Sequence, residues 1–327
     1  MLDFSQKINM RSSSNDLLTI GELLVDLIAD DYGDAHEQET YSKYFGGSPA
    51  NIAMNVRKLG CRSQLAAAVG DDGLGAFLLE RLRRERIDSS LVETVEEATS
   101  VVLLTKSRAT PIPIFYRHAD CRISYRPELE ERLKQSKLLH FSCWPLSGEP
   151  SRSTVERLTV VARTEGIWTG FDPNYHPRLW SKDEAGAACV KAFVGMADIV
   201  KPSEDDAERL FGPDTPERQI DKFLELGARL VILTLGKDGA IASNGRETLR
   251  FPTMATEVTD TTGAGDAFWS GLYAGLIKGY ALREAISLGF AVSAYKLRFT
   301  GAVVDLPDLE TLRNLYGLQD AGGAERE

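Results

Sequence analysis

The segment Val258-Thr259-Asp260-Thr261-Thr262-Gly263-Ala264-Gly265-Asp266-Ala267-Phe268 decides how the rest of the chain is interpreted. Its glycines open directly onto an amphipathic run, which predicts a helix that begins near Gly263 or Ala264. The first backbone N–H groups of such a helix have no partner within the helix and carry the positive end of its dipole. Because Gly263 and Gly265 have no side chain, an anion such as a phosphate can approach these groups closely.

Asp266 lies inside this predicted anion site, where a resting carboxylate would repel a phosphate. A carboxylate is useful there if it takes a proton from a hydroxyl while the backbone N–H groups hold a transferred phosphoryl group. We therefore predict that Asp266 is a general base and that Gly263, Ala264 and Gly265 form the anion hole. An ordinary helix start, with Thr262 as N-cap and Asp266 complementing the dipole, would explain this segment equally well if it stood alone.

A second glycine-bearing stretch lies far upstream and reads Gly46-Gly47-Ser48-Pro49-Ala50-Asn51-Ile52-Ala53. Ser48 is suited to N-cap a helix and Pro49 to its first position. The pattern places Asn51 in the first turn, where its amide can both donate hydrogen bonds to a sugar and accept them. A well-formed helix start with no further role would also explain this stretch by itself.

Together the two stretches resemble the two signature motifs of the ribokinase-like (PfkB) sugar kinases, in the family's order and at roughly its separation. The resemblance covers about residues 17–312. It implies a ribokinase-like α/β fold and ATP-dependent phosphorylation of a sugar hydroxyl, with Mg²⁺ and, in many relatives, a monovalent cation.

Strand-like and helix-like segments alternate from Leu138 to Leu235, which favours a doubly wound, mostly parallel sheet with helices on both faces. Ligands of such sheets collect at the carboxyl ends of the strands. Residues 23–45 and 100–118 interrupt the alternation, and in the resemblance they form a small β-sheet lid over the sugar site. We expect one kinase domain over residues 17–318, with disordered or frayed tails at residues 1–16 and 319–327.

Polar residues are expected around the acceptor alcohol. A lone carboxylate, Asp26, interrupts an apolar run; it is either a turn residue or a group that a ligand completes, because a buried strand seldom holds an unpartnered carboxylate. The resemblance implies that Asp26 binds sugar hydroxyls and that Phe115 and Arg117 reach the sugar from the lid. The predicted sugar site comprises Asp26, Gly46, Gly47, Asn51, Phe115, Arg117, Asp172, Asn174 and Asp266. Neutral and acidic groups dominate this set, which favours an unphosphorylated sugar.

The run Phe171-Asp172-Pro173-Asn174-Tyr175-His176-Pro177-Arg178-Leu179-Trp180 resembles a segment of fructokinases and 2-keto-3-deoxygluconate kinases. His176 stands where these relatives have arginine, so any electrostatic contact of that arginine is in question here. On this resemblance we predict the conversion of fructose to fructose 6-phosphate. Kinases for 2-keto-3-deoxygluconate, ribose or a nucleoside are the alternatives, with Arg117 as the cation for a carboxylate-bearing substrate.

The nucleotide and ion sites follow from the resemblance. Relatives bind Mg²⁺ through waters near an Asn-x-x-Glu motif; this chain has serine and aspartate at those ends, which leaves Asp206 as the metal-positioning residue. Asp260, Thr262 and Ala302 resemble positions that bind a monovalent cation, expected to be K⁺. The residues expected to contact ATP are Lys201, Ser203, Thr234, Gly236, Gly239, Gly263 and Gly265, although a tight turn would also explain the glycines at 236 and 239.

Composition excludes several other classes. Of 327 residues, 43% are hydrophobic and 26% are charged, as in a soluble globular enzyme. The formal net charge of −10 disfavours nucleic-acid and anionic-membrane binding, and no apolar run reaches the ~18 residues of a membrane span. The 4 cysteines are scattered without a CxxC pair, which favours free thiols and a cytoplasmic location.

Two further functional classes can be weighed against a kinase. A catalytically silent relative that only binds ligands would be expected to lack Asp266 or the small residues beside it, and all are present. A dinucleotide-dependent dehydrogenase would need a GxGxxG turn after the first strand, which this chain lacks. The expected partners are therefore a small sugar and ATP, and the exposed face of a lid sheet also favours a homodimer.

Overall fold

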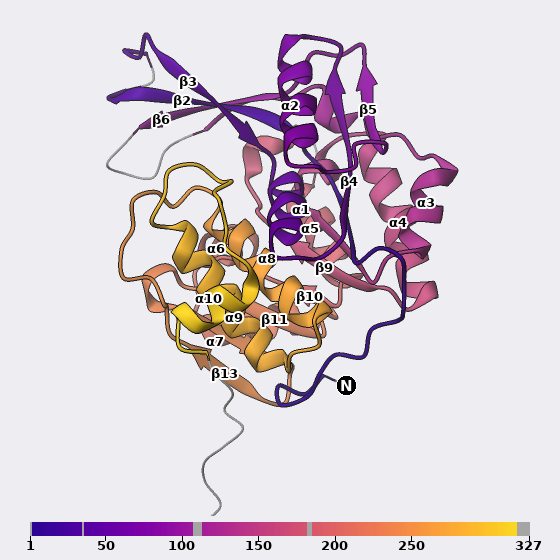
Figure 1. Ribbon diagram of the computed structural model, residues 1–327, viewed down its shortest axis with the longest axis vertical. Coiled ribbons are helices and arrows are strands. Elements are labelled where there is room, and N and C mark those ends of the chain that lie inside the picture. Colours follow the sequence, from indigo (N-terminus) through magenta and orange to yellow (C-terminus); the bar gives the residue numbers. More distant parts are fainter. Residues whose placement is uncertain (1, 35, 107–112, 182–184, 319–327) are drawn as a thin grey trace, which may run out of the picture.

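A computed structural model gives the fold and describes residues 2–34, 36–106, 113–181 and 185–318 (Figure 1). These residues form a nine-stranded sheet in the order β13-β12-β11-β10-β9-β8-β1-β4-β5. Neighbouring strands from β5 to β11 in that order are parallel, whereas β12 and β13 join antiparallel. The strands are β1 (Leu17–Ile20), β4 (Ser63–Gly70), β5 (Val92–Val95), β8 (Leu138–Ser142), β9 (Trp168–Asp172), β10 (Ile199–Val200), β11 (Leu230–Thr234), β12 (Ala240–Ser243) and β13 (Thr248–Phe251).

Consecutive strand residues point to opposite faces of the sheet, and helices cover both faces. Leu18 packs into one core cluster and Leu17 into the other. The face of Leu18 is covered by α3 (Pro127–Lys134), α4 (Ser151–Glu165), α5 (Gly186–Val194), α6 (Glu204–Phe211) and α7 (Pro216–Glu225). The face of Leu17 is covered by α1 (Ser48–Lys58), α8 (Ala264–Ile277), α9 (Leu282–Lys296) and α10 (Leu309–Leu315). The predicted doubly wound, mostly parallel sheet is therefore confirmed.

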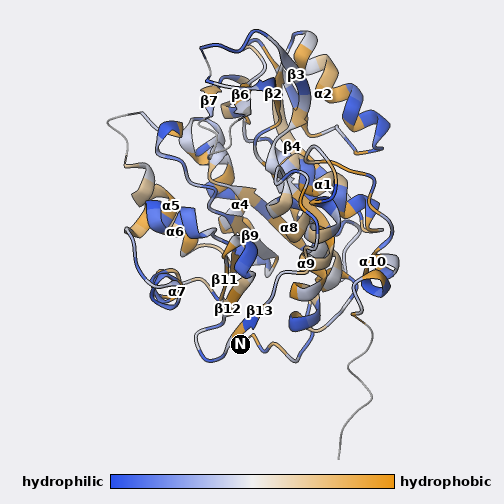
Figure 2. Ribbon diagram, turned by 90° about the vertical axis from the view of Figure 1, so that its left-hand side faces the viewer, coloured by the Kyte–Doolittle hydropathy of each residue, from blue (hydrophilic) through white to orange (hydrophobic). Residues whose placement is uncertain are grey.

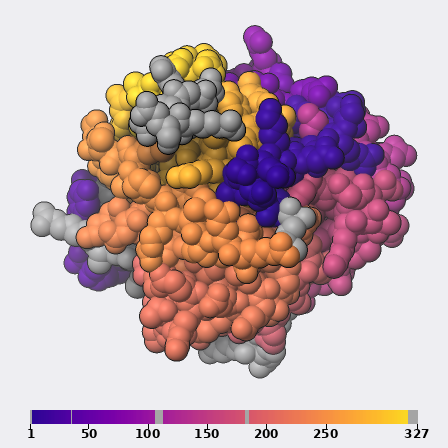
Figure 3. Space-filling model, turned by 90° about the horizontal axis from the view of Figure 1, so that it is seen from below, coloured from indigo at the N-terminus to yellow at the C-terminus, as the bar shows by residue number. Residues whose placement is uncertain are grey.

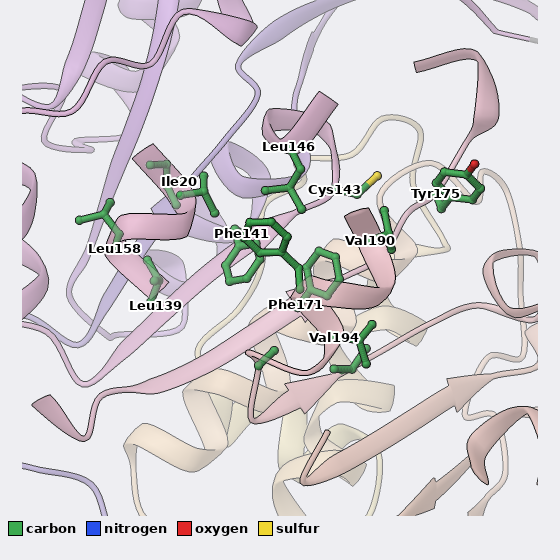
Figure 4. Close-up of a cluster of buried hydrophobic side chains, with 14 of the residues drawn as sticks. Ile20, Leu139, Phe141, Cys143, Leu146, Leu158, Phe171, Tyr175, Val190 and Val194 are labelled. Atoms are coloured by element: carbon green, nitrogen blue, oxygen red, sulfur yellow. The ribbon is translucent and has the colours of Figure 1, made fainter. Parts of the chain in front are cut away.

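Aromatic side chains occupy the centre of the first of these clusters (Figure 4). The rings of Phe141 on β8 and Phe171 on β9 stack with their centroids 4.9 Å apart. Leu146 and Val190 enclose them from the side of the helices. Since β8 and β9 end beside this packing, their carboxyl ends, and the polar residues that follow, are held in fixed positions.

On the opposite face, α8, which Figure 2 shows between α1 and α9, is almost wholly buried. Gly271 makes this possible, because a Cβ there would lie 2.5 Å from the backbone oxygen of Leu288 on α9. Gly170 on β9 plays the same part, since a Cβ there would overlap the hydroxyl of Tyr273. Close packing against α9 and the sheet therefore fixes where α8 begins, and with it the position of Asp266.

A second, four-stranded sheet in the order β3-β2-β6-β7 projects from the body (Figure 1). This lid sheet consists of β2 (Leu24–Tyr32), β3 (Tyr41–Gly46), β6 (Val101–Lys106) and β7 (Ile114–Tyr116). Its strands match the predicted lid segments 23–45 and 100–118, with β3 ending one residue later at Gly46. Residues 35 and 107–112 of these segments lie outside the described residues. Between the lid sheet and the body packs α2 (Gly73–Arg84), which contacts β2 and β4.

Short 3-10 helices connect several of these elements. They are η1 (Ala119–Cys121), η2 (Trp144–Ser147), η3 (Pro177–Leu179) and η4 (Gly236–Asp238). Three of them follow the carboxyl ends of β8, β9 and β11, where ligands of parallel sheets bind. Within the described residues, no helix has both the length and the apolar character needed to cross a membrane.

The amino-terminal segment departs from the prediction of a disordered tail over residues 1–16. Phe4 is only 1% exposed, and it packs with Ile8 into the core cluster beneath α9. The N–H groups of Leu282 and Arg283 donate to the backbone oxygens of Gln6 and Phe4. Figure 3 shows this segment, in indigo, lying along the surface beside the orange carboxyl-terminal part. The apolar side chains therefore anchor it, whereas residues 319–327 lie outside the described part of the chain.

Candidate active site

The two glycine-bearing stretches meet, because α1 packs against α8 with both amino ends together. Ser48 Oγ donates to Asp266 Oδ1 over 2.6 Å, and Asn51 Nδ2 donates to Asp266 Oδ2 over 2.8 Å. The Oδ1 atom of Asn51 is buried and has no partner. Ser48 and Asn51 thus each hold one oxygen of the Asp266 carboxylate. The amide oxygen of Asn51 is left to accept a hydrogen bond from a ligand.

In neither helix does the N-cap residue supply a side-chain cap, contrary to the expectation that Ser48 and Thr262 are N-caps. The N-cap residues are Gly47, with φ of 109°, and Gly263, with φ of 74°. Both angles favour glycine. The Ser48 hydroxyl turns to Asp266 instead. At the start of α8, Ala264 N donates to Thr261 O over 3.1 Å, and the N–H groups of Gly265 and Asp266 are the ones left for an anion.

A cavity of about 510 Å³ opens beside Asp266 and brings together most of the predicted sugar site. Its predicted members are Asp26, Gly47, Asn51, Phe115, Asp172, Asn174 and Asp266. Several residues predicted to contact ATP or a metal line it as well, namely Lys201, Ser203, Asp206, Thr234, Thr262, Gly263, Gly265 and Ala302, together with Ala264 of the predicted anion hole. The cavity therefore joins the carboxyl ends of strands to the amino ends of α1 and α8.

Two predicted sugar contacts are not among the residues that line this cavity. The guanidinium of Arg117 is buried and bonds to Asp120, Ser147 Oγ and the backbone oxygen of Trp144. These bonds connect the end of the lid sheet to η1 and η2, so the Arg117 guanidinium is not available to the sugar from above. Gly46 lies behind Asp26, and a Cβ there would come within 2.4 Å of that carboxylate.

Asp26 and Asp266 in the cavity have raised pKa values. Burial, with a smaller contribution from the charge of Asp266, raises the pKa of Asp26 to about 7. Burial also raises the pKa of Asp266, although its bonds from Ser48 and Asn51 favour the charged form. Within the part of the chain that the structure describes, no donor bonds to the Asp26 side chain, so this carboxylate can accept bonds from a ligand.

Lys201 supplies a buried positive charge beside the anion hole. Its Nζ lies 3.2 Å from Asp172 Oδ2 and would be 3.5 Å from a Cβ at Gly265. Trp269 Nε1 donates to the same Asp172 oxygen over 2.8 Å. Since Trp269 is on α8, the helix that carries Asp266 also fixes the partner of this lysine.

A second cavity, of about 640 Å³, lies on the other side of the anion hole. It contains the predicted nucleotide residues Gly236 and Gly239, and apolar side chains that suit a nucleobase, among them Val258, Phe268, Phe290 and Leu297. The two cavities share the residues Ser203, Thr234, Thr261, Ala264 and Gly265. They meet where the amino end of α8 presents its N–H groups.

Asp206 caps a helix as well as lining the first cavity. Its Oδ2 accepts bonds from Ser203 N and Oγ, and its Oδ1 accepts a bond from Tyr175 N. Burial and the charge of Asp172 raise its pKa. Because its oxygens are already occupied, Asp206 fits contact with Mg²⁺ through waters better than direct ligation. Among the described residues, no group of three acidic, histidine or cysteine side chains is arranged to hold a metal.

The predicted monovalent-cation residues lie together beneath the amino end of α8. Asp260 Oδ1 accepts bonds from Thr262 N and Oγ1, and Asp260 Oδ2 accepts one from Gly301 N. Ala302 packs under Gly263, because a Cβ added at Gly263 would lie 2.7 Å from the Cα and Cβ atoms of Ala302.

Several residues of the cavity had no predicted role. Glu22 is 2% exposed, and its carboxyl accepts bonds from Ser48 N over 3.2 Å and Ser142 Oγ over 2.8 Å. Burial raises its pKa to about 8. The only signal for Glu22 in the sequence was an acidic residue at the end of a buried strand.

Arg209 also lines the cavity, and His176 packs edge-on against Phe115 with ring centroids 5.4 Å apart.

Known proteins share this fold and these motifs. A family model described as pfkB family carbohydrate kinase matches residues 14–309. The curated ATP-dependent 6-phosphofructokinase of Thermoanaerobacterium thermosaccharolyticum is 56% identical over 98% of this chain and 99% of its own length.

Solved structures agree with this match. The fructokinase of Halothermothrix orenii is 40% identical, with a TM-score of 0.76, covering 84% of this chain and 97% of its own. A double mutant of Vibrio cholerae fructokinase, in its fructose-, ADP- and potassium-bound form, is 27% identical, with a TM-score of 0.79, covering 93% of this chain and 99% of its own. The chain therefore belongs to the pfkB family of carbohydrate kinases and is an ATP-dependent sugar kinase.

Proposed function

We propose that this kinase transfers the γ-phosphoryl group of ATP to a hydroxyl of a fructose unit, with Asp266 as general base. The observation that carries the proposal is the shared wall of the two cavities at Ala264 and Gly265, next to Asp266. A sugar in the first cavity and a triphosphate in the second would meet at the uncapped amino end of α8. Phosphoryl transfer requires this in-line alignment of acceptor and donor.

Asp266 would accept the acceptor's proton as the new O–P bond forms and the bond from the γ-phosphorus to ADP breaks. Its carboxylate is a far weaker base than an alkoxide, so the proton moves during transfer and not before it. The N–H groups of Gly265 and Asp266 would hold the charge on the transferred group, and that of Ala264 would join them on leaving Thr261 O. Asp206 would hold Mg²⁺ through waters, and the ion would supply positive charge against the phosphates.

Around the acceptor, Asn51 offers a buried oxygen with no partner among the described residues, and Asp26 offers its carboxylate. Asp172 and Asn174 complete the polar wall. Lys201, beside Gly265, would neutralise charge on the phosphoryl group. The nucleotide would lie along Thr234, Gly236 and Gly239, with its base among the apolar side chains. These roles follow from placement and chemistry, and the variants in the Discussion test them.

For the acceptor we favour fructose 6-phosphate over fructose. The support is the 56% identity with a 6-phosphofructokinase together with two cations, Lys201 and Arg209, that line the cavity. Arg209 is bonded to Tyr175 O and to Asp205, and a sugar phosphate could draw its guanidinium inward. Fructose is the second candidate, because the 40% identical solved structure is a fructokinase.

An assay of ADP release with fructose 6-phosphate, fructose and 2-keto-3-deoxygluconate tests the acceptor. We expect the highest kcat/KM with fructose 6-phosphate. Arg209→Gln should raise KM for fructose 6-phosphate and leave KM for fructose unchanged. A higher kcat/KM with fructose would assign the enzyme as a fructokinase, and no turnover with any of the three sugars would refute the proposed function.

We also propose that two copies pair through their lid sheets. Tyr32, Ile114 and Tyr116 expose large side chains on lid strands, with 69% of Tyr32 exposed. Large exposed side chains on a small sheet with open edges favour association with another chain. Sedimentation analysis of the wild type and of Tyr116→Lys tests the pairing, which is refuted if the wild type sediments as a monomer at assay concentration.

A further inference from the structure

The pfkB family includes a potassium-bound fructokinase, and Asp260, Thr262 and Ala302 occupy the positions expected for such an ion. In this chain a side chain reaches that region from the end of α9. Lys296 is fully buried, and its Nζ donates to the backbone oxygen of Asp260 over 2.7 Å. The same Nζ lies 4.0 Å from Asp260 Oδ2.

Most of the acceptor positions on Asp260 are already used, and the one left on Oδ2 lies 4.0 Å from Lys296 Nζ. Both carboxylate oxygens of Asp260 accept hydrogen bonds, from Thr262 and from Gly301 N. Its backbone oxygen accepts the bond from Lys296. A potassium ion at the Asp260 backbone oxygen would have to displace Lys296 Nζ, and one at Oδ2 would lie close to this ammonium of like charge. The residues present therefore do not fit a bound monovalent cation.

A buried ammonium is costly unless opposite charge compensates it. Burial lowers the pKa of Lys296, while the charges of Asp260 and Asp266 raise it and so favour the ammonium. The lysine thus brings to Asp260 the single positive charge that a potassium ion would bring.

The contacts of this lysine lie at the base of the anion hole. Asp260 precedes Gly263, the N-cap of α8, by three residues, and its carboxylate ties Thr262 to Gly301. Thr259 N donates to Leu297 O over 2.7 Å, so the end of α9 is bonded to the same loop. Whatever charge lies beside Asp260 therefore holds the loop that presents the anion-hole N–H groups.

We propose that the ammonium of Lys296 permanently replaces the monovalent cation at Asp260 and makes this enzyme independent of potassium. This inference rests on the proposed function, since it concerns the same anion hole. Lys296 is a positioning residue, because it acts on the phosphoryl group only through the loop from Asp260 to Gly263.

The test compares sugar-dependent ADP release in potassium, sodium and choline chloride at equal ionic strength. We expect the wild-type rates to agree within about twofold. Lys296→Met keeps the length of the side chain and removes its charge, so kcat should fall on the order of tenfold to a hundredfold. Potassium, but not choline, should restore part of this loss, and potassium should raise the unfolding temperature of the variant but not of the wild type.

Lys58→Met is the matched control, because Lys58 Nζ donates to Val304 O, a few residues beyond Gly301. We expect this variant to show no response to potassium in rate or unfolding temperature. Wild-type turnover that requires potassium would overturn the inference while leaving the proposed function intact, as would full kcat in Lys296→Met. The wild-type salt comparison decides by itself if Lys296→Met does not fold, and absence of turnover in every salt would instead refute the function.

Discussion

Asn51 donates a hydrogen bond to Asp266 over 2.8 Å, although 215 positions separate them in the chain. The bond joins the first turn of α1 to the first turn of α8, each of which has a glycine as its N-cap residue. The amino ends of α1 and α8 therefore meet at the carboxylate of Asp266. The predictions below concern this point and the segments that hold it.

Asp266→Asn should lower kcat about 10²–10⁴-fold, because the amide cannot accept the proton of the acceptor. KM for the sugar should change little, since the amide keeps the shape of the carboxylate. Steady-state rates of ADP release measure both. Asp221→Asn, on the exposed side of α7, is the matched control, and wild-type kcat in Asp266→Asn would remove this residue from the role of base.

Asp26 should make sugar binding depend on pH around its raised pKa of about 7. Sugar hydroxyls donate to the charged carboxylate, so KM should rise as pH falls from 8 to 6, and at most about tenfold per unit. Asp26→Asn should abolish that slope. If KM for the wild type stays constant over this range, the protonation state of Asp26 does not affect sugar binding.

The same carboxylate should lower stability at higher pH. Its folded pKa is above its unfolded value of 3.8, so the folded state binds more protons between those values and loses stability as pH rises through about 7. Asp26→Asn should therefore raise the unfolding temperature more at pH 8 than at pH 4. Calorimetry at the two pH values measures the difference, and equal shifts would contradict the buried, unpaired state of Asp26.

Glu22 should position the base through Ser48, which bonds to both carboxyl groups. Glu22→Leu should lower kcat on the order of tenfold to a hundredfold with little change in KM. Glu22→Gln should retain most activity, because it can still accept from Ser48 N and can donate to Ser142 Oγ. Asp16→Asn, a buried carboxylate at the opposite end of β1, should affect stability alone, and a rise in KM for Glu22→Leu would instead indicate direct sugar contact.

Phe4→Ala should destabilise the protein by about 3 kcal/mol, because it leaves a cavity in the core beneath α9. The active site is distant, so kcat of the folded enzyme should not change. Urea unfolding measures the difference, with the exposed Ser5→Ala as control. Equal free energies of unfolding for Phe4→Ala and the wild type would mean that the amino-terminal segment does not contribute to the core.

The sequence predicted the parts of this architecture that repeat or that carry a motif. Alternating segments predicted the parallel sheet, and the glycine-bearing stretches predicted that Asn51 and Asp266 would meet. Arg117 could not be placed in this way, because its direction is set by Asp120 and by Ser147 from a distant segment.

Other features depend on packing that leaves no periodic trace. A lysine at the end of a helix usually complements the dipole at the surface, so nothing in the pattern distinguished the buried Lys296. Phe4 and Ile8 lie in a polar segment without periodicity. Where they pack is determined by the apolar surface near α9 that they cover.

The wall common to the two cavities has a practical consequence for inhibitors. A compound that links adenosine to a hexose through a chain of phosphates could occupy both cavities at once, with its phosphates at Ala264 and Gly265. Tethering makes the second contact intramolecular, so such a compound gains affinity over its separate halves without any new contact. Its best linker length would report the distance over which the phosphoryl group travels.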